Sequence, residues 1–351
     1  MHNVGECECV LIRGCTILYL KALFMIKLLH LLLLFSLSSN VLFSQTYAGS
    51  PSDFFFSQEV GSQPMLMSPG FISSGMGEAY GALAPGGDEF YYCLMEKGVF
   101  SAILMTRFHD GFWTYPEVVP FSGEYMDASP FVTPDGNFLY FTSNRPEHEE
   151  DLVADWNVWR CSRESGGKWS IPELMPFSDK DRNEVSISVD QRGTIYFSAD
   201  YDGGTITLDE NALDIFSVQS DVNGAWGEAV KLPETVNSGY PERDPAISPD
   251  GKCLVFSSPR PGGEGTSDLY VSYKSEGGWS EAVSLGSKVN SAAYECCPMF
   301  TADGKLLIFS SSVTRKIPRQ LKYSTIKKWL LGPGNGSGDI WYMDASTIMK
   351  D

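Results

Sequence analysis

The chain has little histidine and none of the short motifs that carry common enzyme chemistry. Four of its 351 residues are histidine, and only His109 and His148 follow residue 44. This scarcity excludes a histidine-rich metal site, and a Ser-His-Asp triad would have to use one of these two residues. The sequence also lacks a Gly-x-Ser-x-Gly elbow, a Walker loop, a dinucleotide fingerprint and a Cys-x-x-Cys pair. Triad-based and nucleotide-dependent catalysis are therefore disfavoured.

Positive charge is also scarce. The chain has 26 Lys and Arg against 44 Asp and Glu, which gives a net charge of −18 at pH 7. Because a strongly acidic surface repels phosphate groups, the composition disfavours a nucleic-acid partner.

The segment 313–338 departs from this acidity, because it contains six basic residues and no acidic one. The six are Arg315, Lys316, Arg319, Lys322, Lys327 and Lys328. Unopposed positive charge in an acidic protein indicates a partner-binding site, for an envelope protein or a glycan. The alternatives are a loop that folds onto acidic neighbours and a solvated excursion.

No apolar run is long enough to span a bilayer, which takes about twenty residues. The longest, residues 28–37, follows a short basic stretch and precedes small polar residues, as in a secretory signal peptide. We interpret residues 1–44 as an upstream extension and signal peptide, with Met25 as the true start. Residues 45–351 are then one exported domain, periplasmic or extracellular, without a membrane span. An uncleaved anchor is the alternative.

Cysteine is too irregular to build a disulfide framework. Beyond residue 44 the chain has Cys93, Cys161, Cys253, Cys296 and Cys297. An odd number scattered over a long chain indicates small buried apolar residues rather than a set of bridges. The adjacent Cys296 and Cys297 would rarely bond to each other.

A repeat governs the chain after residue 60. Trp113, Trp169, Trp226 and Trp279 recur at spacings of 56, 57 and 53 residues. Before each lies an apolar run that ends in an aromatic residue, and three of the runs in the repeat follow an Asp-Gly turn, a strong hairpin signal. Four short strands in each period are typical of a β-propeller blade.

Two stretches of this repeat resemble a known family. Residues 242–258, from Glu-Arg-Asp-Pro-Ala to Phe-Ser-Ser, and residues 295–311, from Glu-Cys-Cys-Pro-Met to Phe-Ser-Ser, resemble the WD40-like propeller repeat of the TolB type. Residues 260–270 resemble the family's link to the third strand. The resemblance covers roughly residues 60–345 and implies an exported scaffold or binding protein. It implies no reaction, and the chain has no room for TolB's amino-terminal α/β domain.

The two ends of the repeat complement each other. The last unit lacks a fourth strand, and residues 72–78 align without gaps with residues 236–242 and 289–295. The stretch just before residue 72 therefore occupies a fourth-strand register. We predict an all-β, five-bladed propeller of four-stranded blades, closed by the amino-terminal strand. Six blades are the alternative if residues 45–60 and 312–338 hide another unit.

A carboxylate recurs where each inter-blade link enters the innermost strand. The residues are Glu78, Asp127, Glu242 and Glu295, and the third blade offers either Arg182 or Glu184. Carboxylates arranged around one axis could hold a cation, and ligation by oxygen alone suits Ca²⁺. The alternative is that each carboxylate accepts backbone N–H groups of its own link. No cofactor is required.

Together these features favour a non-catalytic binding or scaffolding module of the cell envelope. The alternative is a propeller hydrolase that acts on a carbohydrate. Glycoside hydrolysis needs only two carboxylates, and the acidic composition neither supports nor excludes such a pair.

Overall fold

The structure is a computed structural model, and it describes residues 60–148, 155–178, 182–200, 213–221, 223–317 and 319–349. The predicted extension and signal peptide, residues 1–44, lie outside the described residues.

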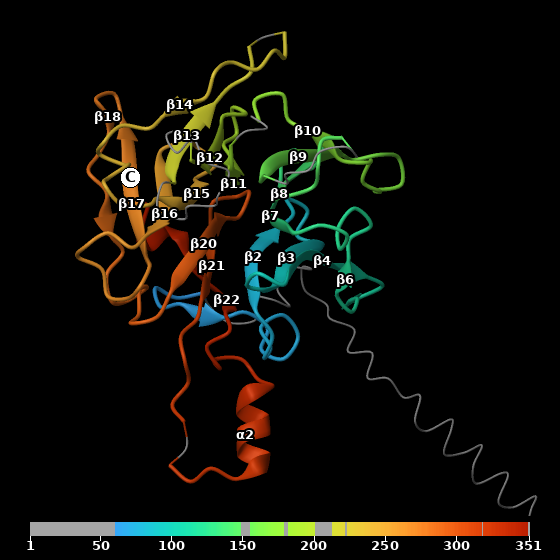
Figure 1. Ribbon diagram of the computed structural model, residues 1–351, viewed down its shortest axis with the longest axis vertical. Coiled ribbons are helices and arrows are strands. Elements are labelled where there is room, and N and C mark those ends of the chain that lie inside the picture. Colours follow the sequence, from blue (N-terminus) through green and yellow to red (C-terminus); the bar gives the residue numbers. More distant parts are fainter. Residues whose placement is uncertain are drawn as a thin grey trace, which may run out of the picture. The chain divides into compact units, whose positions relative to one another are not determined.

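The described chain is a five-bladed β-propeller, as predicted from the repeats (Figure 1). Blade 1 contains β2 (Glu78–Leu83), β3 (Glu89–Glu96), β4 (Phe100–His109), β5 (Phe112–Trp113) and β6 (Glu117–Val118). Blade 2 contains β7 (Asp127–Val132), β8 (Phe138–Ser143), β9 (Asn157–Ser162) and β10 (Glu173–Leu174). Blade 3 contains β11 (Glu184–Val189), β12 (Ile195–Ala199), β13 (Asp214–Val218) and β14 (Val230–Lys231).

Blade 4 contains β15 (Arg243–Ile247), β16 (Cys253–Ser258), β17 (Asp268–Ser275), β18 (Gly278–Trp279) and β19 (Val283–Ser284). Blade 5 joins the two ends of the chain and contains β20 (Glu295–Phe300), β21 (Leu306–Ser311), β22 (Asp339–Asp344) and β1 (Met65–Leu66). The helices of the described residues are α2 (Tyr323–Leu330) and the short 3₁₀ helix η2 (Ala345–Thr347).

The amino-terminal strand closes the ring, as predicted. Strand β1 pairs antiparallel with β22, and Met65 lies opposite Tyr342. The backbone N–H of Met67 donates to the carbonyl of Ile340 at 2.9 Å, and the Met67 side chain is fully buried. The innermost strands β2, β7, β11, β15 and β20 contact one another in cyclic order, which leaves no gap in the ring.

The turn chemistry explains the first hairpin of three blades. Gly136 has φ +71°, a value that an L-residue rarely adopts. The Asp135 carboxylate accepts the backbone N–H of Asn137 at 3.0 Å and so fixes the turn between β7 and β8. Asp250 and Asp303 play the same role in blades 4 and 5.

The repeat tryptophans pack between blades. The indole N–H of Trp169, in blade 2, donates to the Tyr91 hydroxyl of blade 1 at 2.9 Å. Trp279 of blade 4 meets the ring of Tyr196 in blade 3 edge-on, with centroids 6.3 Å apart. Each of these tryptophans therefore contacts the second strand of the preceding blade, which holds neighbouring sheets in register.

Residues 312–338 form an arm rather than a blade, so the six-bladed alternative is wrong for this segment. Its described residues contain helix α2 and one bridge, between Thr314 and Asn335, and no longer strand. The other segment of that alternative, residues 45–60, lies outside the described residues except for its last residue.

Candidate functional site

The innermost strands share an unusual backbone conformation at one position. Tyr80, Ser129, Ser186, Asp244 and Cys297 have φ values of 55°, 55°, 54°, 52° and 54°. The ladder shifts register at this position in every blade, which defines a β-bulge. A non-glycine residue in this region costs roughly 1–3 kcal/mol, and such strain clusters at functional sites.

Four of these five side chains meet on the propeller axis. The Tyr80 hydroxyl donates to Asp244 Oδ1 at 3.2 Å, and the Ser186 hydroxyl donates to the same oxygen at 2.5 Å. Asp244 Oδ2 accepts the Ser257 hydroxyl at 2.9 Å and the backbone N–H of Cys297 at 3.2 Å. Residues of blades 1, 3, 4 and 5 thus converge on one carboxylate, which is 6% exposed.

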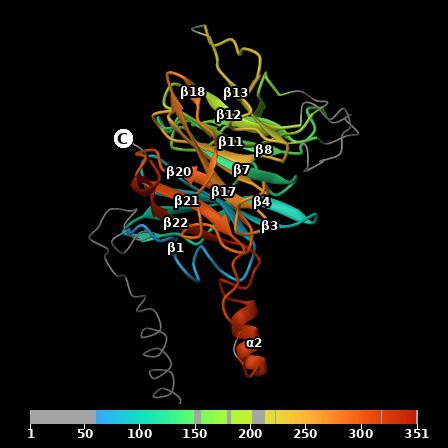
Figure 2. The same ribbon diagram turned by 90° about the vertical axis from the view of Figure 1, so that its left-hand side faces the viewer.

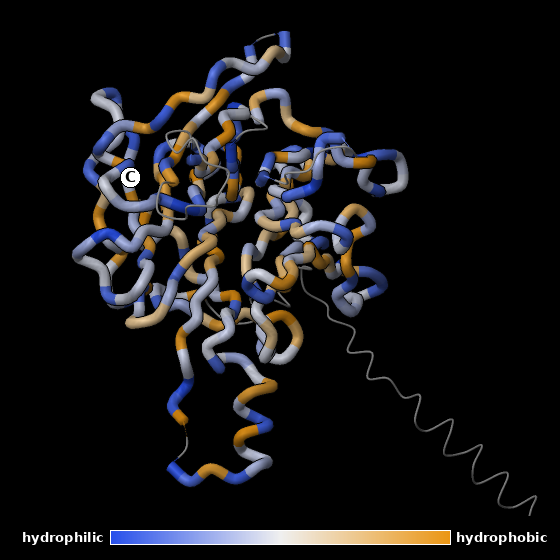
Figure 3. Tube along the Cα trace, viewed as in Figure 1, coloured by the Kyte–Doolittle hydropathy of each residue, from blue (hydrophilic) through white to orange (hydrophobic). Residues whose placement is uncertain are grey.

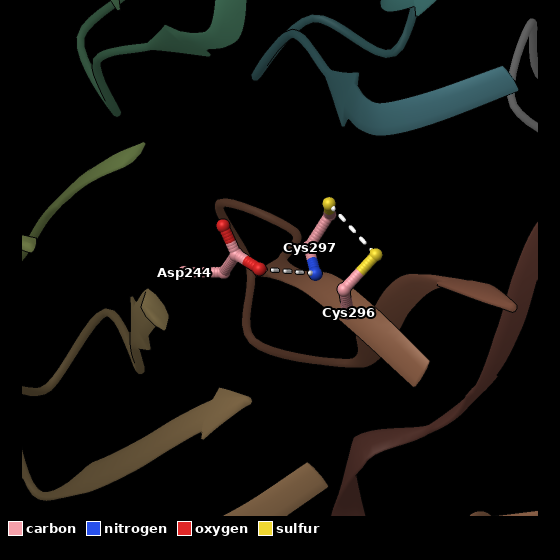
Figure 4. Close-up of side chains that lie close together, drawn as sticks. All are labelled: Asp244, Cys296 and Cys297. Atoms are coloured by element: carbon pink, nitrogen blue, oxygen red, sulfur yellow. Dashed lines mark hydrogen bonds between the residues drawn. The ribbon is translucent and has the colours of Figure 1, made fainter. Parts of the chain in front are cut away.

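Two thiols lie beside this carboxylate (Figure 4). The Cys297 thiol donates to the sulfur of Cys296 at 3.1 Å. Burial raises the pKa of the Cys297 thiol and of the Tyr80 hydroxyl well above their usual ranges, so both groups are neutral at pH 7. Within the described residues, Asp244, Cys296 and Cys297 are the one trio of metal-ligand side chains whose donor atoms lie within 4.8 Å of one another.

The recurrent carboxylates lie two residues before the axial positions and bind their own links. In three blades a serine four residues earlier donates both its backbone N–H and its hydroxyl to the carboxylate. The pairs are Ser74 with Glu78, Ser238 with Glu242, and Ser291 with Glu295. The backbone N–H bonds measure 3.2, 2.9 and 2.8 Å in that order. This is the geometry of a side chain that caps a turn.

Two of the recurrent carboxylates also form an ion pair with an arginine. Arg145 Nη2 lies 2.8 Å from Asp127 Oδ1, and Arg260 Nη2 lies 2.6 Å from Glu242 Oε1. In blade 3 the buried Glu184 begins the innermost strand, so Glu184 rather than Arg182 occupies the repeat position.

The described chain does not bring Glu78, Asp127, Glu242 and Glu295 together around one point, because none of them belongs to a compact trio of metal-ligand atoms. The hydrogen bonds that these carboxylates accept from their own inter-blade links explain why an acidic residue recurs at this position. The Ca²⁺ site on these residues stays a prediction.

The junction between blades 1 and 5 contains two carboxyl groups with raised pKa values. Burial raises the pKa of Glu78 to about 7, and the charge of Asp339 adds to this rise. Burial also raises the pKa of Asp339 to about 6. The two blades meet here, since the backbone N–H of Glu78 donates to the carbonyl of Gly338, the residue before Asp339, at 3.2 Å.

We expect the free energy of unfolding to fall as the pH rises from 5 to 8. A carboxyl whose pKa is higher in the folded state binds more protons there, so its stabilisation is complete below the unfolded pKa and is lost as the pH passes the folded value. At about 1.4 kcal/mol per pKa unit, the loss is on the order of 3 kcal/mol. Urea unfolding at both pH values measures it.

The double variant Glu78→Gln, Asp339→Asn is the control for this pH dependence. It should flatten the profile between pH 5 and 8, since neither amide titrates. Groups with lowered pKa values, such as Glu89 and Asp303, act at lower pH and do not mask the effect. A wild-type protein that is more stable at pH 8 than at pH 5 would contradict the assignment.

The arm projects away from the blades in two perpendicular views (Figures 1 and 2). Its base is fixed, because the backbone N–H of Arg315 donates to the Gly334 carbonyl at 2.7 Å and the Asn335 amide donates to the Gly75 carbonyl at 3.0 Å. Helix α2 buries none of its residues, and Tyr323 and Leu331, at or just beyond its ends, are 81% and 67% exposed.

The six basic residues predicted as a partner site lie on this arm, and all six are exposed. None of them forms an ion pair among the described residues, although the charge of Arg315, at the base of the arm, opposes the rise in the pKa of Asp339 that burial causes. Lys327 and Lys328 occupy the last turn of α2, where positive charge stabilises the helix dipole. Apolar and hydrophilic residues alternate along the helix (Figure 3).

Neither histidine belongs to the axial cluster. The side chains of His109 and His148 are 72% and 74% exposed, and each lies near a carboxylate of a neighbouring residue. The axial residues Tyr80, Ser186 and Asp244 were not predicted as site residues. The signal that could have found them is their spacing, two residues after each repeat carboxylate.

The fold and this site define a five-bladed β-propeller with a polar, thiol-containing axis. Solved structures with a similar fold include TolB from Acinetobacter baumannii, at 16% identity and a TM-score of 0.45, over 76% of this chain and 54% of that one. The putative TolB from Agrobacterium tumefaciens has the same identity and TM-score, with coverages of 77% and 90%. The α-L-arabinofuranosidase from Lactobacillus brevis is 10% identical, with a TM-score of 0.46 and coverages of 77% and 92%.

The chain thus spans about half the length of the first of these structures. No protein-family model and no curated protein sequence matches it. None of the helices in the described residues combines the length and the apolar character that a bilayer crossing requires.

Proposed function

We propose that the protein is an exported, non-catalytic propeller that binds a protein partner of the cell envelope through the arm, residues 312–338. The observation that carries this proposal is the exposure of helix α2, in which no residue is buried. The arm exposes both apolar and positively charged side chains, and an exposed combination of the two is typical of an interaction surface.

The arm carries helix α2 on an anchored base. A helix of eight residues is marginal by itself in water, so its stability depends on the anchored base or on a partner. Tyr323, Leu330 and Leu331 supply apolar surface, while Lys327 and Lys328 supply charge.

Charge complementarity indicates the chemistry of the partner. A cationic arm on a protein of net charge −18 favours a protein with an acidic surface around an apolar groove. A glycan would use the charges but would leave the aliphatic side chains in water, so we favour the protein partner over the glycan.

Reversal of Lys327 and Lys328 to glutamate should weaken capture of the partner at least ~10-fold, because like charges across an interface cost several kcal/mol. The melting temperature of the blades should not change, since both side chains are exposed on the arm, although helix α2 loses the favourable charges of its last turn. Capture from the envelope fraction, followed by titration of each captured protein against the wild type and the variant, measures the effect.

The matched control is Lys252→Glu, Lys288→Glu, which changes the net charge equally at two exposed lysines of blade 4 and its link. It should bind the partner like the wild type. Equal loss in both variants would indicate a general charge effect and would contradict a site on the arm. Release of sugar from a glycan panel by the wild-type protein would contradict the non-catalytic proposal and support the carbohydrate hydrolase.

A further inference from the structure

We propose that Asp244, Cys296 and Cys297 bind a thiophilic divalent cation of the Zn²⁺ type on the axis of the propeller. The three side chains offer two sulfur atoms and one carboxylate oxygen within 4.8 Å of one another (Figure 4). Zn²⁺ takes this mixture of ligands in proteins, and three protein ligands leave a fourth position for water or for a bound molecule.

The distances suit this ion after a small adjustment. Two sulfur atoms at about 2.3 Å from a tetrahedral Zn²⁺ lie about 3.8 Å apart. Here the sulfur atoms of Cys296 and Cys297 are 3.1 Å apart, so they must separate by roughly 0.7 Å. The proposal requires this change to come from rotation about χ1 of the two cysteines.

The carboxylate of Asp244 is already oriented and forms no ion pair with another described residue. Its contacts in the described residues are neutral donors, namely the hydroxyls of Tyr80, Ser186 and Ser257 and one backbone N–H. Buried charges are ordinarily paired or coordinate a metal. A cation would provide the missing charge, and the three hydroxyls are the outer contacts that typically fix a ligating carboxylate.

A disulfide between the two cysteines fits the geometry less well. The Cα atoms of bridged cysteines are usually 4.4–6.8 Å apart, whereas adjacent residues joined by a trans peptide lie about 3.8 Å apart. The peptide bond between Cys296 and Cys297 is not cis. No disulfide joins the cysteines of the described chain.

A small cavity lies further along the innermost strands. It has a volume of about 20 Å³, lies at the carboxyl ends of these strands, and is lined by residues that include Phe131, Val189, Ile247 and Met299. Such a space holds about one water molecule. Of the two proposed sulfur ligands, Cys296 is half-buried and Cys297 is buried.

Binding of Zn²⁺ releases protons from the two thiols. As each Zn–S bond forms, the thiol loses its proton to solvent. Thiolate ligands select Zn²⁺ over hard cations such as Ca²⁺ and Mg²⁺.

The test uses the reduced protein, freed of metal and titrated with ZnCl₂ in a calorimeter, with CaCl₂ as the control cation. We expect one Zn²⁺ per chain, and an affinity at least ~10-fold lower in Cys296→Ala, Cys297→Ala and Asp244→Asn, because loss of even an outer contact commonly costs that much. The matched control Cys161→Ala removes a buried thiol of blade 2 and should bind Zn²⁺ normally.

A second measurement does not depend on the folding of any variant. Zn²⁺ should protect Cys296 and Cys297 of the wild type from alkylation, as mapped by peptide mass spectrometry, and Co²⁺ should produce thiolate charge-transfer absorption. The proposal is overturned by absence of Zn²⁺ binding, by binding that the three variants leave unchanged, by a preference for Ca²⁺, or by a Cys296–Cys297 disulfide in the protein as isolated.

Discussion

A chain that begins at residue 71 is expected to aggregate and to lose cooperative unfolding, whereas a chain that begins at residue 45 should remain folded. The first truncation removes β1, and with it the pairing that covers the outer edge of β22. An unpaired strand edge is a template for association with other chains.

The truncation also removes Met67, which is fully buried with Phe90, Ile308 and Ile340. Loss of a buried methionine side chain alone costs about 2–5 kcal/mol. Together with the lost strand, the cost is comparable to the roughly 5–15 kcal/mol by which domains are stable. Urea unfolding followed by tryptophan fluorescence, with light scattering for aggregation, measures both effects. A truncation at residue 71 that is soluble and as stable as the longer chain would disprove closure by β1.

The number of blades and the closure could be predicted because they depend on local patterns repeated along the chain. Asp-Gly turns, apolar runs and the spacing of Trp113, Trp169, Trp226 and Trp279 are each visible without the structure. The fourth strand of the last blade was found by alignment of residues 72–78 with two later links. These signals fix which strands pair, since register follows the turn and the apolar alternation.

The axial cluster could not be predicted in the same way. Its positions hold Tyr80, Ser129, Ser186, Asp244 and Cys297, which share no chemical type. Only the closed ring brings them together, and the bulge that turns them to the axis depends on a left-handed backbone that no glycine marks at these positions. Helix α2 was also missed, because eight residues with mixed charge and apolar character give a weak helical signal.

The repeat pattern predicts where the recurrent carboxylates lie but not which residues they contact. The repeat register placed Glu78 and Glu295 at the first residue of their strands and Glu242 directly before β15. It could not show that the same residue type has different partners in different blades. Glu242 forms an ion pair with Arg260. In the described structure, Glu295 instead accepts hydrogen bonds only from Ser291 and Ser311.

This difference predicts unequal effects of the same substitution. Glu242→Gln should lower the free energy of unfolding by about 3 kcal/mol, because it leaves the guanidinium of Arg260 without a charged partner. The Arg260 side chain is only 12% exposed, so water offsets little of that loss. Glu295→Gln keeps an acceptor for its serine donors and should cost about 1 kcal/mol. Urea unfolding of the two variants at pH 7 measures the difference.

The double variant Glu242→Gln, Arg260→Met separates the ion pair from the general burial of the site. If the cost of Glu242→Gln comes from the stranded guanidinium, removal of Arg260 should recover part of it, with a coupling of about 1–3 kcal/mol. The hydrogen bond from Arg260 to the Val236 carbonyl, at 2.6 Å, is lost in this variant, so recovery is incomplete. Equal costs for Glu242→Gln and Glu295→Gln, or costs that simply add in the double variant, would show that the arginine does not stabilise the link through its charge.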